Sequence, residues 1–232
     1  MRFLALFRKE LREVLPWMLL AAVVVLAIGG LDVLSMMRSG DQPPPYYYFG
    51  EASGYLRIYS VLLVSDLWAF APLLLLTSCG LGLVVAGRQF LFPGVVREWP
   101  FTLHRSTTRG AVLLAKLCAA GAAFLLGIGA VWSVLYLYAS QPGALRRPVE
   151  GRIYWQGWIY ILLGVLAYFA AAVASLSRAR WYATRLFPLV IAAIVIPLVL
   201  VTWNMAVVAT VLLIGLALLA VQLIDLMLNR EF

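Results

Sequence analysis

The chain has 232 residues, of which 64% are hydrophobic and 12% are charged, and its formal net charge is +8. A water-soluble domain carries roughly 45–50% apolar and about 25% charged residues, so this composition excludes an ordinary soluble fold. The basic residues lie between long apolar runs rather than on one basic face, which argues against nucleic-acid binding and predicts an all-α integral membrane protein that resides in a lipid bilayer.

Residues 1–15 are predicted to form an amphipathic helix in the inner membrane interface, ahead of a six-span transmembrane domain at 16–232. Its apolar face comprises Phe3, Phe7, Leu11 and Val14 at helical spacing, whereas the basic residues Arg8, Lys9 and Arg12 fall elsewhere. Pro16 is expected to turn the chain into the bilayer.

Apolar runs that could cross a bilayer follow, because a spanning helix needs about 20 predominantly apolar residues. The first four lie at 14–37, 67–87, 117–139 and 153–177. The run 186–224 contains no charge and, as one helix, would be nearly twice as long as the hydrocarbon core is thick. We therefore expect two spans there, joined by a turn at 202–204, which makes six transmembrane helices.

The distribution of Lys and Arg predicts the orientation, because cytoplasmic loops carry an excess of these residues. With the N-terminus inside, 13 of the 18 basic residues fall on the cytoplasmic side. The five on the outer side are Arg38, Arg57, Arg146, Arg147 and Arg152. This bias predicts a multi-pass protein of the plasma (inner) membrane with both termini in the cytoplasm.

Four ionisable residues lie near the predicted span ends, namely Asp32, Asp66, Lys116 and Asp225. Charges at membrane depth are costly and usually functional, but a side chain near a helix end can reach the interface. We expect Lys116 and Asp225 to meet water or headgroups at the inner interface, and the other two at the outer one. Without a charge near the midplane, a secondary carrier is less favoured and stays an alternative.

Small residues form a stripe along one face of the third predicted span. The stripe comprises Ala115, Ala119, Ala123 and Gly127, at four-residue spacing. Such stripes let two helix backbones approach closely in a membrane, so we expect this face to pack against another helix.

Residues that could carry catalysis are sparse. The single histidine, His104, lies in a predicted loop, and Cys79 and Cys118 lie in apolar stretches away from it. The sequence contains no nucleophile elbow, zinc-protease motif or phosphate-binding Walker A loop. We therefore predict no catalytic, metal or cofactor site, and the chain is not expected to be an enzyme.

The predicted cytoplasmic segment 88–110 combines basic with large apolar side chains. A helix in this segment would place Trp99 and Leu103 on one face, and Phe101 and Arg105 on another. Thr107 or Thr108 can cap the helix that follows. So many exposed apolar residues predict contact with a protein partner or with the membrane surface.

Two motifs resemble the permease subunits of ABC-2 type ABC transporters. Lys9-Glu10-Leu11-Arg12 stands where such permeases bear a Lys-Glu-Leu-Arg pattern in a basic N-terminal helix. Arg105-Ser106-Thr107-Thr108-Arg109, followed by Val112 and Lys116, resembles a second family pattern, with Ser106 in place of the usual proline. Glu98 resembles a glutamate that the family carries in the same cytoplasmic segment.

The resemblance implies a permease subunit that forms the substrate pathway as a homo- or heterodimer with a second permease subunit. A separate cytoplasmic ABC ATPase would hydrolyse the ATP. A cytoplasmic coupling helix between spans two and three would dock on that ATPase, through Arg97, Glu98, Trp99, Phe101, Leu103, Arg105, Thr108 and Arg109. The alternatives are a stand-alone secondary carrier and a membrane scaffold subunit that transports nothing.

Overall fold

The computed structural model describes residues 2–38, 71–95, 108–141, 151–177, 182–202 and 205–229. These ranges are helical apart from a few terminal residues, and no strand occurs within them. The helices are α1 (Arg2–Arg38), α3 (Ala71–Ala86), η3 (Gly87–Leu91), α4 (Phe92–Val95), α6 (Arg109–Ala122), η4 (Ala123–Gly129), α7 (Ala130–Ala139), α8 (Gly151–Leu176), α9 (Tyr182–Val201) and α10 (Met205–Asn229). The π-helical segments η3 and η4 are continuous with their neighbours, so α3–η3–α4 and α6–η4–α7 each form one rod.

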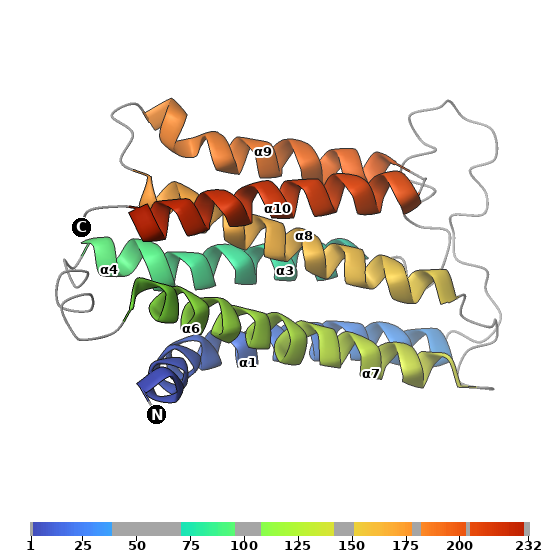
Figure 1. Cartoon of the computed structure of the whole chain (residues 1–232). Helices are drawn as coiled ribbons and strands as arrows, with labels where there is room; N and C mark the ends of the chain where they lie inside the picture. The colour runs from blue at the N-terminus through green and yellow to red at the C-terminus, as the bar shows by residue number, and fades with distance from the viewer. Residues whose placement is uncertain are drawn as a thin grey trace.

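The helical rods form one bundle in which successive rods run in opposite directions (Figure 1). Helix α8 packs against α3, α9 and α10, while α1 packs along α6 and η4. The first turn of α1 and the last turn of α10 lie at the same end of the bundle (Figure 1). We call this end the terminal end.

Within the described ranges, five helical stretches are long and apolar enough to cross a bilayer. They are Phe3–Leu31, Pro72–Leu91, Arg109–Ala139, Gly151–Leu176 and Ala206–Asn229. Their outward faces are apolar too, since Leu76, Leu126 and Leu213 are exposed, and such faces suit contact with lipid tails. The described part of the chain is therefore all-helical, and the protein is a multi-pass membrane protein, as its composition and apolar runs predicted.

The long apolar run near the C-terminus is divided between α9 and α10. Helix α9 ends at Val201 and α10 begins at Met205, which confirms the break that we predicted at 202–204. The Thr202 hydroxyl donates to the Leu198 carbonyl, 2.7 Å away, at the end of α9. The apolar stretch of α9, Leu186–Leu200, is shorter than the other five, so a sixth span stays a prediction.

Pro16 lies inside α1 rather than at the end of a separate helix. The sequence predicted an independent helix at 1–15, but the structure continues as one helix from Arg2 to Arg38. Figure 1 shows the first turns nearly end-on and the rest along the bundle, so α1 bends. An interior proline removes one backbone hydrogen bond and bends a helix without necessarily ending it. We call the part before the proline the leading segment.

The predicted cytoplasmic segment 88–110 is shorter than the sequence suggested. The second rod stays helical through η3 and α4 to Val95, and the third rod begins at Arg109 rather than at Leu117. The sequence predicted span ends at the charges of Arg88 and Lys116, but Arg88 pairs with Glu13 and Lys116 with Glu10 in the folded chain. Residues 96–107, which include the predicted docking residues Arg97, Glu98, Trp99, Phe101, Leu103 and Arg105, lie outside the described residues.

The predicted small-residue stripe is buried, and its partner is α1. Ala115, Ala119 and Ala123 have no exposed surface, and Gly127 is buried as well. A Cβ atom added at Gly127 would lie 2.7 Å from the side chain of Met18. The stripe therefore lets the third rod approach α1 closely, as small residues do in membranes.

Candidate functional site

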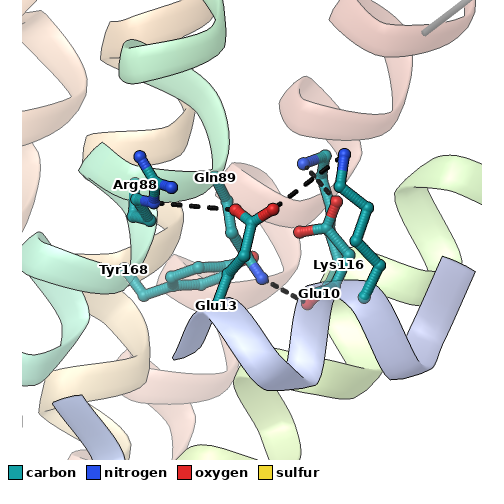
Figure 2. Close-up of polar contacts among 7 residues, drawn as sticks. Glu10, Glu13, Arg88, Gln89, Lys116 and Tyr168 are labelled. Carbon is teal, nitrogen blue, oxygen red and sulfur yellow. Dashed lines mark hydrogen bonds and ion pairs between the residues drawn. The ribbon is translucent and has the colours of Figure 1, made fainter. Parts of the chain in front are cut away.

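A buried ion pair joins the leading segment of α1 to α6 at the terminal end. Glu10 is 6% exposed and Lys116 is 5% exposed, and Lys116 Nζ donates to Glu10 Oε1 at 2.8 Å (Figure 2). The prediction that the Lys116 charge meets water or headgroups is therefore wrong. The bundle tolerates the buried ammonium because a carboxylate faces it, and an unpaired buried charge would be far more unfavourable.

A buried glutamine extends the ion pair to two further helices. Gln89 of η3 donates through Nε2 to the main-chain carbonyl of Lys116 at 3.2 Å. Its Oε1 accepts a hydrogen bond from the Tyr168 hydroxyl of α8 at 2.8 Å. Helices α1, η3, α6 and α8 thus meet at one cluster, which we call the polar node and define as Glu10, Gln89, Lys116 and Tyr168 (Figure 2).

The π-helical geometry of η3 explains how the node is built. Gln89 and Phe90 are successive residues, yet both are buried. A π turn holds an extra residue, which changes the direction of the side chains that follow, and such turns recur at functional sites. The Phe90 ring then lies 5.7 Å from Lys116 Nζ, close enough for a cation–π contact, and it packs against Tyr168.

A weaker set of ion pairs lies at the rim of the node. Glu13 lies 3.9 Å from Lys9 Nζ and 3.6 Å from Arg88 Nε. All three side chains are partly exposed, and exposed pairs contribute roughly 0–1 kcal/mol. The ion pairs of the rim therefore add little stability, whereas the side chains of the polar node are buried and hydrogen-bonded to one another.

Thr108 and Arg109 are the two predicted docking residues that the structure describes. Thr108 is the N-cap of α6, because its side-chain oxygen accepts from the Ala111 amide at 3.4 Å, which confirms the capping prediction. The guanidinium of Arg109 donates to the Leu228 carbonyl in the last turn of α10 at 3.1 Å. Carbonyls in a last helical turn lack intrahelical donors, so Arg109 stabilises the end of α10.

Replacing the cap residue tests this assignment. Thr108→Ala should lower the free energy of unfolding by about 1 kcal/mol, because the Ala111 amide loses its acceptor. The control is Thr210→Ala, since the Thr210 hydroxyl donates to the Ala206 carbonyl of its own helix and caps no helix start. Melting curves in one detergent would compare the two variants, and equal melting temperatures would contradict the capping role.

Of the three other charges that we predicted at the interfaces, the structure describes the side chain of Asp225 but not those of Asp32 and Asp66. Asp225 is exposed near the end of α10, where its carboxylate accepts from Asn229 Nδ2 at 2.6 Å, consistent with a place at the interface. Asp32 belongs to α1, but its side chain is outside the described residues, as is all of Asp66. Among the described residues, no group of three or more His, Cys, Asp or Glu could hold a metal ion.

The polar node lies toward the terminal end rather than in the middle of the bundle. Lys116 comes seven residues after the start of α6, which corresponds to about 10 Å along the helix. The centre of the rod from Arg109 to Ala139 is about 12 Å further on. The buried charges therefore lie nearer to the start of this rod, at the terminal end, than to its centre.

Sequence reasoning missed the node, although two signals pointed to it. Glu10 lies one helical turn before Val14, on the same face as Phe3 and Phe7, so the predicted apolar face includes a carboxylate. Gln89 stands among apolar residues without a charged neighbour other than Arg88. Neither signal identifies the partner, because Glu10 and Lys116 are 106 residues apart in the chain.

Comparisons with known proteins found no match to a protein-family model, to a curated protein or to a solved structure.

Proposed function

We propose that the chain is the membrane-spanning permease subunit of an ATP-driven transporter of the ABC-2 type. It would line the substrate pathway together with a second permease subunit, and a separate cytoplasmic ATPase would hydrolyse the ATP. The observation that carries this proposal is the meeting of the two motifs. Glu10 of Lys9-Glu10-Leu11-Arg12 and Lys116, the last residue of the second motif, form the buried 2.8 Å ion pair.

The surroundings of residues 96–107 support a coupling role for that segment. Helix α4 ends just before it at Val95, and α6 begins just after it at the Thr108 cap. Before the segment, Gln89 is hydrogen-bonded to α6 and α8. After the segment, Arg109 is hydrogen-bonded to α10. A partner that displaced the segment would therefore move helices that are hydrogen-bonded to the rest of the bundle.

The charge distribution supports the proposed topology of six spans with both termini in the cytoplasm of a plasma-membrane protein. The start of α1, the short helix α4 and the start of α6 lie at the terminal end (Figure 1). The basic residues Arg8, Lys9 and Arg12 belong to the first turns of α1, Arg88 to η3 just before α4, and Arg109 is the first residue of α6. At the opposite end, α1 finishes at Arg38 and α8 begins near Arg152. An excess of basic residues marks the cytoplasmic side of membrane proteins.

Reporter fusions test this topology. A reporter that is active only in the cytoplasm should be active when it is fused after residue 232, and also when it is fused before residue 1. A reporter that is active only outside the membrane, placed after residue 202, should be active because α9 would have crossed by then. Outside activity of the fusion after residue 232 would contradict the six-span topology.

Charge reversal in the docking segment tests the proposed ATPase partner. In Arg97→Glu with Arg105→Glu, the ATPase that co-purifies with the native chain should fall at least about tenfold, a change worth roughly 1.4 kcal/mol of binding free energy. Basic and aromatic residues together are enriched in protein interfaces, and reversed charge should repel an acidic partner groove. The readouts are the stoichiometry of the ATPase band and the ATP hydrolysis in the purified complex.

The controls for this experiment follow from the structure. Arg152→Glu makes the same charge change at the opposite end of the bundle and should leave the complex intact. Arg109 is unsuitable for charge reversal, because its guanidinium contacts α10 and its loss would disturb the fold. A complex that forms normally with the double variant would remove this segment from the mechanism. If the segment rests on anionic headgroups instead, no ATPase should co-purify with any variant.

The buried ion pair is also the observation that most favours the alternative, a stand-alone secondary carrier. Ionisable residues inside a membrane bundle often mark ion pathways. The place of Lys116 near the terminal end argues against this function, because carrier sites lie near the midplane. A carrier would work on an ion gradient with no ATPase bound, so transport by the reconstituted chain alone would favour it.

A further inference from the structure

The leading segment of α1 has few attachments to the bundle. Of residues 3–15, only Glu10 and Val14 are buried, while Arg8, Lys9 and Arg12 are exposed. Beyond Pro16 the helix follows the other rods, but the leading segment points away from their direction (Figure 1). The other residues that face the bundle are only half-buried, so the position of the segment depends mainly on its two buried residues.

The ion pair is an unusual choice if stability alone is considered. Two buried charges lose their hydration, and replacing such a pair with well-packed apolar side chains is often neutral or stabilising. Here Glu10 Oε2 is buried and has no hydrogen-bond partner among the described residues, so the carboxylate is only partly satisfied. A directional contact does, however, fix the register of two helices, which apolar contacts do less well.

Lys116 links the position of α1 to that of a second helix, η3. Its side chain holds α1, and its main-chain carbonyl accepts from Gln89 of η3. Residues 89 and 116 belong to the two rods that flank segment 96–107. The ion pair therefore connects the leading segment to the Gln89–Lys116 hydrogen bond, which joins the second and third rods.

We propose that Glu10 and Lys116 are a positioning pair, which makes the leading segment of α1 move together with α6. The consequence for transport rests on the proposed function: a docked ATPase that displaces segment 96–107 would move the leading segment as well. The positioning itself is a property of this chain alone, and it can be measured without a partner.

The distance between two spin labels tests the proposal on the full chain in detergent. One label is attached at Ala5→Cys on the leading segment and the other at Leu114→Cys on α6, because both positions are exposed. The native Cys79 and Cys118 are replaced with alanine beforehand. The width of the distance distribution reports whether the two segments move as one.

The test variant is Glu10→Gln with Lys116→Met, which removes both charges and keeps the side chains similar in volume. The distribution should become roughly twofold broader, because Val14 then remains the main buried attachment of the leading segment. The melting temperature should be close to that of the native chain, since no unpaired charge is left. Broadening without loss of stability separates positioning from a purely structural role.

Two further variants complete the experiment. Lys9→Gln with Glu13→Gln removes both partly exposed pairs of the rim, Glu13 with Lys9 and Glu13 with Arg88, and should leave the distribution narrow because exposed pairs contribute little. The exchange Glu10→Lys with Lys116→Glu should restore the narrow distribution. An unchanged width in the neutral variant would overturn the positioning role, even if an ATPase still co-purifies. If the neutral variant gives a broader distribution but the native chain binds no ATPase, the proposed function is contradicted and the positioning role of the pair still holds.

Discussion

Lys116→Met alone should lower the free energy of unfolding by about 3–5 kcal/mol. The substitution leaves the Glu10 carboxylate at 6% exposure, without the ammonium that lies 2.8 Å from it. A buried charge without a partner costs far more than the lost attraction between two charges. The melting temperature in detergent and the yield of monodisperse protein would both fall.

The control for this prediction is Lys9→Met. Lys9 also pairs with a glutamate, but at 3.9 Å and with 58% of its side chain exposed, so its loss should cost roughly 0–1 kcal/mol. Adding Glu10→Gln to Lys116→Met should recover most of the lost stability, because the second change removes the stranded charge. If Lys116→Met is as stable as Lys9→Met, the ion pair is not buried as described.

Gly82→Ala should destabilise the bundle by about 3 kcal/mol, the upper part of the range for overpacking. Helices α3 and α8 cross here with their backbones in contact, and a Cβ atom at Gly82 would collide with the Gly164 carbonyl oxygen. The opposing glycine is equally confined, since its own Cβ would lie 2.6 Å from Ser78. No side-chain rotation relieves a clash with backbone, so the two helices must separate.

Gly80→Ala is the matched control, because it lies two residues away on the other face of the same helix and a Cβ there meets nothing within 4 Å. Alanine favours helix over glycine by up to about 1 kcal/mol, so this variant should be as stable as the native chain or slightly more stable. Equal behaviour of the two variants in thermal unfolding would show that α3 and α8 do not cross at Gly82.

The class of the protein and several local features followed from the sequence. Composition predicted a membrane protein, because 64% hydrophobic residues cannot be covered in water, and the apolar runs along the chain predicted several helical spans. The break after Val201 followed from a length argument, and the Thr108 cap from the preference of hydroxyl side chains for that position. These features depend on residues close together in the chain, so a local pattern is sufficient to predict them.

The polar node and the true ends of two rods were decided by tertiary structure. Arg88 and Lys116 are charged, and a hydropathy argument ends a span at a charge because it treats every charge as facing water or headgroups. In the folded chain Arg88 pairs with Glu13 and Lys116 pairs with Glu10, and the helices continue past both basic residues. A charge can be buried when tertiary packing brings an oppositely charged partner next to it. The partner of Lys116 is Glu10, which is 106 residues away in the chain, so no local pattern could identify it.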